Sequence, residues 1–213
     1  CIRDRNLHYA GDTLLHAEKS ACGEAVLELI ELLTGSVTEQ EANLLYIAVT
    51  TDTGCFQYAN TNAATLRAAA RLLELGADNR KVSMEFFRKI SRARMALVGH
   101  IYSGMRFFRG GQIAIAVVTR ALIDALQATE DDCDDIAGLP GRADGVVVSV
   151  TIRELTDGRS KISVRTTPEV DSCAICAVYG GGGHKMASGC TLTCDPETAV
   201  EKILAAIDQV WPA

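Results

Sequence analysis

The chain of 213 residues has no long apolar run, no excess of positive charge and no internal repeat. No apolar stretch reaches the roughly 18 residues that a membrane crossing needs, and no signal peptide is recognisable. The net charge of −6 argues against a broad electrostatic surface for long nucleic acid, but a local basic pocket for a small anion remains compatible with it. Apolar residues at 48% and charged residues at 23% are typical of a globular protein with one large or two small domains.

The eight cysteines leave three interpretations open, and we expect reduced thiols buried in the core. Cys173 and Cys176 form a Cys-x-x-Cys pair, and with Cys190, Cys194 and His184 they offer zinc ligands as one alternative. Disulfides are the other alternative. Most of these cysteines stand among Ala, Ile and Val, where a free thiol behaves as a small apolar side chain. Reduced thiols imply a reducing, cytoplasmic location.

The most informative segment is a run of four glycines, Gly180, Gly181, Gly182 and Gly183, that ends at His184. Such a run is costly to order, so a folded chain keeps it where the backbone needs unusual dihedrals or a close approach. Successive exposed N–H groups bind anions, and a helix N-terminus after them strengthens the effect. We therefore predict an anion-binding nest closed by His184, with a flexible surface loop as the alternative.

The first half of the chain shows mainly helical patterns. Thr38 and Glu41 have the spacing of a capping box, Asn62 or Thr61 is a candidate helix cap, and Gly76 follows an apolar-periodic segment. The expected helices cover residues 20–33, 39–49, 63–75 and 82–107.

The second half alternates strands with helices. Asp157-Gly158 predicts a tight hairpin turn, and the acidic run over residues 130–135 predicts a solvated surface. The expected strands are residues 112–118, 144–153, 161–166 and 190–194, and the expected helices begin at Thr119 and cover residues 170–179 and 197–210. The pattern predicts an α/β or α+β fold with two lobes, a mainly helical one over residues 1–105 and one with a mixed sheet over residues 106–213.

Asp52 is the first candidate for chemistry outside the glycine run. It stands in Thr51-Asp52-Thr53-Gly54, which we expect to form a tight polar turn after an apolar segment. A carboxylate on such a loop suits Mn²⁺ or Mg²⁺, which prefer oxygen ligands. A helix cap or an Asx turn is the alternative.

Arg165 is the second candidate, at the end of the strand Ile162-Ser163-Val164-Arg165. Side chains alternate along a strand, so Ser163 and Arg165 share a face. A guanidinium there can bind a phosphate through two hydrogen bonds, whereas a solvated arginine or an ion pair with Glu169 is the alternative. Isolated His and acidic residues are left without a role: His8, Asp12, His16, Glu24 and His100.

Two motifs together resemble a known family. They are Thr-Asp-Thr-Gly-x-Phe-x-x-x-Asn-Thr over residues 51–61 and Gly-Gly-Gly-Gly-His-Lys-x-Ala over residues 180–187. The chain resembles the Asp-His-His (DHH) phosphoesterases related to RecJ, in the nanoRNase and pAp-phosphatase branch. Residues 72–78 and Ser163-Val164-Arg165 add to this resemblance.

The resemblance implies the C-terminal part of a DHH domain over residues 1–105 and a DHH-associated, substrate-binding domain over residues 106–213. It implies two Mn²⁺ ions, with Asp52 as catalytic metal ligand, and substrate binding by Ser163, Arg165, His184 and the four glycines. The implied substrates are short RNA, 3′-phosphoadenosine 5′-phosphate or related dinucleotides. A cytoplasmic homodimer without a membrane partner would fit the family.

The chain departs from the family pattern at its start. The first two acidic motifs of the family are absent, and residues 1–6 stand where the Asp-His-His triplet is expected. Either the chain is a fragment, which the missing Met favours, or the triplet has degenerated. We expect these 213 residues alone to bind nucleotide weakly and to hydrolyse it little. The alternatives are a non-catalytic nucleotide-binding module with a degenerate metal centre and an editing hydrolase related through the C-terminal domain.

Overall fold

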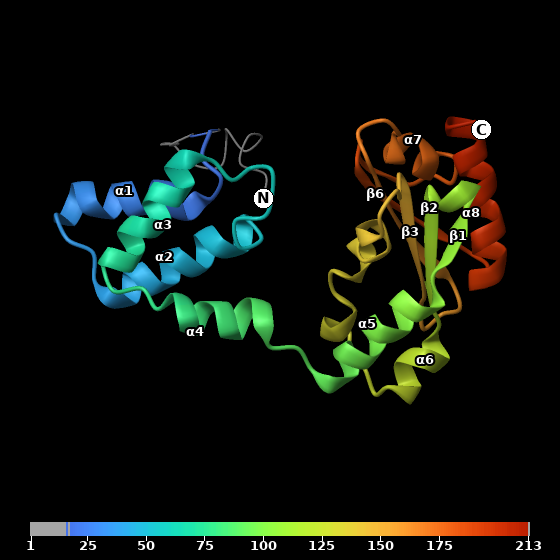
Figure 1. The fold of residues 1–213 in the computed structure, drawn as a ribbon, viewed down its shortest axis with the longest axis horizontal. Helices are drawn as coiled ribbons and strands as arrows, with labels where there is room; N and C mark the ends of the chain where they lie inside the picture. Colours follow the sequence, from blue (N-terminus) through green and yellow to red (C-terminus); the bar gives the residue numbers. More distant parts are fainter. Residues whose placement is uncertain (1–15, 17, 213) are drawn as a thin grey trace. The chain divides into compact units, whose positions relative to one another are not determined.

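The computed structural model describes residue 16 and residues 18–212, and packing divides the chain into two compact units (Figure 1). The first unit ends at Ile90 and the second begins at Ser91. This division lies earlier than the domain boundary expected between residues 105 and 106, because helix α5 (Arg92–Gly104) packs with the second unit. Its side chains Leu97 and Ile101 are buried in a cluster with residues of strand β2 (Ile113–Val118).

The first unit is helical, as expected. Its helices are α1 (Cys22–Thr34), α2 (Glu39–Asp52), α3 (Ala63–Glu74) and α4 (Asn79–Ser83). The capping box before α2 is confirmed: the Glu41 N–H donates to Thr38 Oγ1 (3.2 Å), and the Thr38 N–H donates to Glu41 Oε2 (2.8 Å). Asn62 caps α3 through its side-chain oxygen. The unit is held by a cluster of buried apolar residues that includes Leu27, Leu45, Tyr46, Val49 and Leu72.

The single helix expected over residues 82–107 is wrong. After α4 the chain forms a π-helical turn, Met84–Arg88, and then leaves the helical conformation at Lys89. Ser91 starts a new helix because its hydroxyl accepts from the Arg94 N–H (2.9 Å), which caps α5. The segment then ends in strand β1 (Arg106–Phe108).

The second unit contains a six-stranded mixed sheet in the order β1-β2-β3-β4-β6-β5, which confirms the α/β fold class. Strands β2 and β3 run parallel, and the other neighbours run antiparallel. The remaining elements are β3 (Val148–Glu154), β4 (Ser160–Thr166), β5 (Gly182–His184), β6 (Ala187–Leu192), α6 (Arg120–Ala125), α7 (Ser172–Ala177) and α8 (Pro196–Val210).

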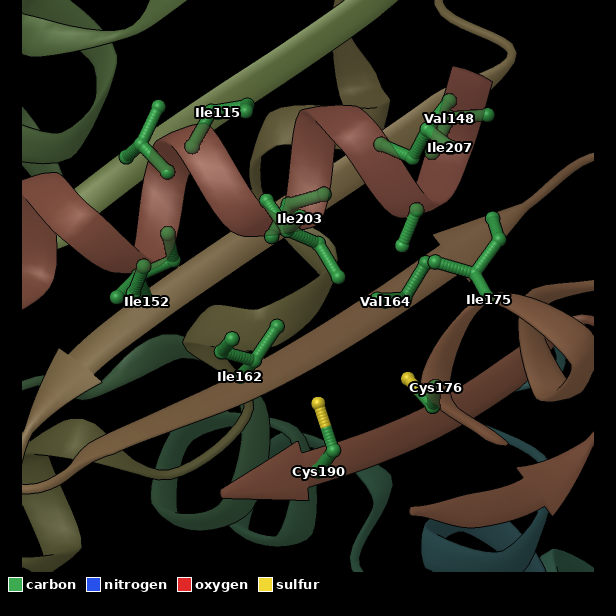
Figure 2. Packing of buried hydrophobic residues seen from close by; sticks show 14 of the residues in the cluster. Ile115, Val148, Ile152, Ile162, Val164, Ile175, Cys176, Cys190, Ile203 and Ile207 are labelled. Carbon is green, nitrogen blue, oxygen red and sulfur yellow. The ribbon is translucent and has the colours of Figure 1, made fainter. Parts of the chain in front are cut away.

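One face of this sheet is apolar and carries α7 and α8. Figure 2 shows Ile203 and Ile207 of α8 lying over Ile152, Ile162 and Val164 of the sheet. All five of these side chains are at most 1% exposed. Burial of this many branched apolar side chains is the main source of stability of the unit.

The opposite face is covered in part by α5, α6 and three short 3₁₀ turns. The turns are Asp131–Cys133, Ile136–Gly138 and Pro140–Arg142. The acidic run predicted to form a solvated surface lies here, and for Asp132 and Cys133 that prediction is wrong, because both are buried. The Asp132 carboxylate accepts hydrogen bonds from the Ser91 hydroxyl and from the N–H and hydroxyl of Thr129, which lower its pKa.

None of the helices within residue 16 and residues 18–212 has the length and hydropathy needed to cross a membrane.

Candidate functional site

The candidate residues of the second unit lie on the polar face of the sheet. The register pairs Arg165 of β4 with Ala187 of β6, and Ala187 with His184 of β5. Directly paired residues point to the same side of a sheet, so Arg165 and His184 share a face. Two strand spacings separate them by about 10 Å, and the small Ala187 side chain between them leaves the row open. Ser163 lies on the same face, two residues before Arg165.

His184 directly precedes the two-residue turn of the β5–β6 hairpin, and hydrogen bonds fix this turn. The tip residue Lys185 has a carbonyl that accepts from the N–H of Ser172 (2.7 Å), at the start of α7. The Met186 carbonyl accepts from the N–H of Thr166 (3.1 Å), at the end of β4. The Ser172 hydroxyl also donates to the His184 carbonyl (3.1 Å). The exposed imidazole therefore projects from an anchored backbone rather than from a loose loop.

The glycine run differs from the predicted nest in two ways. First, no helix begins after it; its second half is the edge strand β5. Second, the N–H groups of Gly180 and Gly181 donate to the carbonyls of Ala177 (3.0 Å) and Cys176 (2.9 Å), so these two amides close α7 instead of facing a ligand. The binding role assigned to the four glycines stays a prediction. Because the amides of Gly180 and Gly181 are already hydrogen-bonded, Gly182 and Gly183 are the better candidates for that role.

The glycines are required mainly by close packing. A Cβ at Gly181 would lie 2.3 Å from the carbonyl oxygen of Gly189, and one at Gly183 would lie 2.5 Å from that of Ala187. Gly180 and Gly183 also have positive φ angles of 71° and 150°. A Cβ at Gly182, in contrast, would meet nothing within 4 Å.

Arg165 lines two cavities of about 190 Å³ each on the polar face. The basic cavity contains Arg165 with Ser163, Arg153 and Lys161, and the hydroxyl cavity contains Arg165 with Ser149, Thr166 and Thr167. The ion pair expected as an alternative for Arg165 is not formed, because the Glu169 carboxylate accepts from the Thr167 hydroxyl (3.3 Å). The hydrogen bond recorded for the Arg165 guanidinium goes to the Val164 carbonyl (3.0 Å).

Three further residues of the basic cavity were not predicted as site residues from the sequence: Thr151, Arg153 and Lys161. The register pairs Arg153 with Lys161 and Thr151 with Ser163, which places all of them on one face. The alternation along residues 161–165 was visible in the sequence, but the pairing partner of each residue was not. The charge of Arg153 is already balanced by Glu130, since its Nη1 lies 2.7 Å from Oε2 of that carboxylate. Lys161 is exposed.

Asp52 occupies the last turn of α2 rather than the tight turn expected over residues 51–54. The hydroxyls of Thr50, Thr51 and Thr53 donate back to carbonyls one turn earlier in α2. The turn comes afterwards, where Gly54, Cys55 and Phe56 have positive φ angles of 54°, 55° and 67°. For the two residues with a Cβ, this conformation costs about 1–2 kcal/mol each.

The backbone at Asp52 is anchored by Asn60. The Asn60 amide donates to the carbonyls of Asp52 (3.1 Å) and Ser20 (3.2 Å). This side chain, which belongs to the motif over residues 51–61, ties the end of α2 to the segment before α1. The Asp52 side chain is half-buried and remains accessible to a ligand.

The described residues do not form a metal centre by themselves. Within residue 16 and residues 18–212, no three His, Cys, Asp or Glu side chains gather closely enough to hold a metal ion. Asp52 therefore has no companion ligands in this part of the chain, and the expected position of the Asp-His-His triplet, residues 1–6, lies outside the described residues. The zinc ligand set suggested by Cys173, Cys176, Cys190 and Cys194 is not assembled either.

The seven described cysteines are free thiols, as expected, although Cys22 is exposed. Cys176 and Cys190 point toward one another in the apolar core (Figure 2). Cys190 donates a hydrogen bond that lowers the pKa of the Cys176 thiol to about 7, and the Ser188 hydroxyl, 3.0 Å from Cys176 Sγ, acts in the same direction. The pKa of Cys190 is raised, because its own ionisation would remove this hydrogen bond.

A known domain family covers most of the second unit. It is the DHHA1 domain family, which matches residues 110–211. The bifunctional oligoribonuclease and PAP phosphatase NrnA of Thermus thermophilus is 36% identical over 191 residues, which are 89% of this chain and 56% of that protein. The protein of the same name from Mycoplasma genitalium is 31% identical over 173 residues, or 81% of this chain and 53% of that protein.

A solved structure extends the likeness to the fold. The crystal structure of an exopolyphosphatase-related protein from Bacteroides fragilis has a TM-score of 0.84 and 25% sequence identity, over 95% of this chain and 60% of that one. The chain therefore spans little more than half the length of the relatives it matches.

Proposed function

The chain belongs to the DHH superfamily, in the nanoRNase and pAp-phosphatase branch, and from this membership we propose that it binds the substrate of a phosphoesterase. The proposed substrates are short oligoribonucleotides and 3′-phosphoadenosine 5′-phosphate. Bifunctional oligoribonuclease and PAP phosphatase is the name of the relatives from T. thermophilus and M. genitalium.

One observation carries this proposal: the sheet register aligns Ser163, Arg165 and His184 on the polar face, beside two cavities. Arg165 has a planar guanidinium that matches a phosphate through two parallel hydrogen bonds. The imidazole of His184 and the hydroxyl of Ser163 add hydrogen-bonding groups on the same face. No carboxylate has to be displaced from Arg165, since its recorded hydrogen bond goes to a carbonyl.

Asp52 is proposed as the Mn²⁺ ligand that this chain supplies. Two Mn²⁺ ions held there would supply activation of a water molecule and stabilisation of charge on the phosphate oxygens. The described residues do not complete such a centre, so we assign to them substrate binding and not bond cleavage. The 213 residues alone are accordingly proposed to hydrolyse nucleotides little, and the whole protein is proposed to be a Mn²⁺-dependent exonuclease and phosphatase. A reducing, cytoplasmic location and a homodimer complete the proposal.

The test is calorimetric titration of the 5′-phosphorylated dinucleotide pApA into the 213-residue chain. Wild type is compared with Arg165→Ala and His184→Ala, each with and without Mn²⁺. We expect Arg165→Ala to weaken binding at least tenfold, because it removes a charged bidentate contact, and His184→Ala to weaken it about threefold to tenfold. Arg159→Ala is the matched control, since this arginine is paired with Asp157 in the hairpin turn outside both cavities.

Binding that depends on Arg165 but not on Mn²⁺ supports a substrate site on the second unit. Binding equal in wild type, Arg165→Ala and Arg159→Ala would refute the site. Hydrolysis by this chain at a rate that rises with Mn²⁺ and vanishes in Asp52→Asn would refute the proposal that these residues lack bond cleavage.

A further inference from the structure

Two thiols from different elements meet in the apolar core of the second unit. Cys176 lies in α7 and Cys190 in β6, and Figure 2 shows their side chains directed toward one another. The hydroxyl oxygen of Ser188 lies 3.0 Å from Cys176 Sγ, and Cys190 is two residues farther along the same strand face. The two thiols are therefore close neighbours in space, although a hairpin separates them along the chain.

The backbone holds both cysteines in place. The carbonyl of Cys176 accepts from the Gly181 N–H (2.9 Å), and Cys190 pairs with Ile162 in the sheet. A Cβ at Gly181 would lie 2.5 Å from the Cβ of Cys190 and 3.0 Å from the carbonyl oxygen of Cys176. Both cysteines thus border the same point of the chain, and a disulfide between them would join two elements that already touch.

The pair contains one thiol that ionises easily and one that stays protonated. The Cys190 thiol and the Ser188 hydroxyl donate to the sulfur of Cys176, and these hydrogen bonds lower the pKa of Cys176 to about 7. The thiolate is the form of cysteine that reacts with oxidants, so Cys176 is the nucleophile of the pair at neutral pH. Cys190, whose pKa is raised, lies beside it as the second thiol.

The cover over the pair is thin at Gly181. Cys176 has no exposed surface and Cys190 is 7% exposed, so large reagents are kept away from both sulfur atoms. Gly181 is partly exposed, borders both cysteines and has no side chain to cover them. Hydrogen peroxide is only slightly larger than water, so it suits this narrow approach better than a bulky disulfide does.

We propose that Cys176 and Cys190 are a peroxide-sensitive dithiol that closes reversibly to a disulfide. The inference goes beyond the proposed function and does not depend on it, because neither sulfur lies on the polar face of the sheet. It is compatible with a reducing location, where disulfides are transient and serve to sense oxidants.

The step consumes one hydrogen peroxide and two thiols. The Cys176 thiolate attacks one peroxide oxygen and the O–O bond breaks, which gives a sulfenic acid and a hydroxide that takes up the proton released by Cys176. The Cys190 sulfur then attacks the sulfenic sulfur, the S–S bond forms and the S–O bond breaks. The leaving hydroxide takes the Cys190 proton. The two thiols lose two electrons in total, and the peroxide gains them and becomes two water molecules.

The disulfide would fasten the hairpin that carries His184. Ser172 of α7 already binds this hairpin, because its hydroxyl donates to the His184 carbonyl (3.1 Å) and its N–H donates to the Lys185 carbonyl (2.7 Å). A covalent bond from α7 to β6 closes a loop that contains the glycine run and the turn. Closing this loop restricts the unfolded chain, so the oxidised protein should be the more stable form.

The experiment maps the thiols of the 213-residue chain before and after treatment with hydrogen peroxide. Free thiols are blocked with N-ethylmaleimide during unfolding, and trypsin then cuts after Lys185, between the two cysteines. The disulfide joins the peptides of residues 166–185 and 186–202, and fragmentation in the mass spectrometer identifies the linked cysteines. Cys173→Ala and Cys194→Ala are the matched controls, because these partly exposed thiols lie in the same two peptides.

We expect peroxide to link Cys176 to Cys190 in wild type and in both control variants, and dithiothreitol to reverse the link. The midpoint of thermal unfolding should rise by at least about 5 °C on oxidation. Cys176→Ala and Cys190→Ala should show neither the link nor the rise. The mapping itself uses wild-type protein, so it decides the question even if one of these variants fails to fold.

Three results would overturn the proposal. A disulfide from Cys173 or Cys194 in wild type would assign the oxidation to the more exposed thiols. Free thiols at Cys176 and Cys190 under conditions that oxidise Cys22, which is exposed, would show that the pair does not react. A linked wild type whose unfolding midpoint does not rise would show that the bond does not fasten the hairpin.

Discussion

The two faces of the sheet in the second unit use the same strands for different purposes. Along β4, Ile162 and Val164 are fully buried beneath α7 and α8, whereas Ser163 and Arg165 line a cavity on the other side. The apolar face has few alternatives for each side chain, because its residues interlock with two helices. On the polar face, Ser163 and Arg165 are only half-buried, beside the two cavities. Stability and binding are thus separated by a single step along the strand, which neighbouring substitutions can test.

The largest effect is expected from Ile162→Ala on the apolar face. It removes three of the four side-chain carbons from a site with no exposed surface, so the free energy of unfolding should fall by about 3 kcal/mol. The neighbouring change Ser163→Ala should lower it by less than about 0.5 kcal/mol, because the side chain is only half-buried. Urea unfolding of the second unit measures both. Similar losses for the two variants would contradict the division between the faces.

The glycine run offers the next test, since it crosses from the apolar core to the open edge. Gly181→Ala should destabilise the protein by about 2 kcal/mol, because its Cβ would lie 2.3 Å from a backbone oxygen and 2.5 Å from the Cβ of Cys190. Gly182→Ala is the matched variant, with nothing within 4 Å of its Cβ, and should cost less than about 0.5 kcal/mol. Thermal unfolding of both gives the answer. Equal midpoints would mean that close packing does not explain the glycines.

Much of this second unit could be predicted from local sequence signals. The alternation in Ile162-Ser163-Val164-Arg165 correctly places Ser163 and Arg165 on one face, because the period of a strand is fixed by its backbone. The Asp157-Gly158 turn correctly joins β3 to β4. Capping residues were equally reliable, as Thr38 and Asn62 show.

The predictions that did not hold concern residues whose surroundings depend on contacts between distant parts of the chain. The burial of Asp132 follows from its hydrogen bond with Ser91, which lies 41 residues away in the chain. From the sequence alone, Gly181 is predicted to be part of an anion nest. Its close packing against Gly189 can be seen only in the structure. The cavities lie between residues 133–141 and strands β3 and β4. No periodicity in the sequence indicates that this segment lies against these strands.

A smaller effect is expected from the thiol pair inside the apolar face. The pKa of Cys176, lowered to about 7, means that the folded protein releases this proton at a lower pH than the unfolded chain. The free energy of unfolding should therefore rise by about 1 kcal/mol as the pH increases from 6.5 to 8.5. Above that range the raised pKa of Cys190 acts in the opposite direction.

The pH effect is isolated by comparing wild type with Cys176→Ala and Cys190→Ala under reducing conditions. Both variants should lose this rise, the first because the titrating group is gone and the second because its hydrogen-bond donor is gone. A rise of the same size in Cys176→Ala would assign it to other groups.

The smallest effect on stability is expected where the effect on binding is largest, at Arg165 on the polar face. Its guanidinium donates a hydrogen bond to the neighbouring Val164 carbonyl, and its side chain is half-buried. Arg165→Met keeps this apolar stem and removes the charge, so the free energy of unfolding should change by less than about 0.5 kcal/mol in either direction. The same sample should bind pApA at least tenfold more weakly. A loss of stability near that of Ile162→Ala would mean that the arginine supports the fold, and the separation of the two faces would then fail at the residue on which binding most depends.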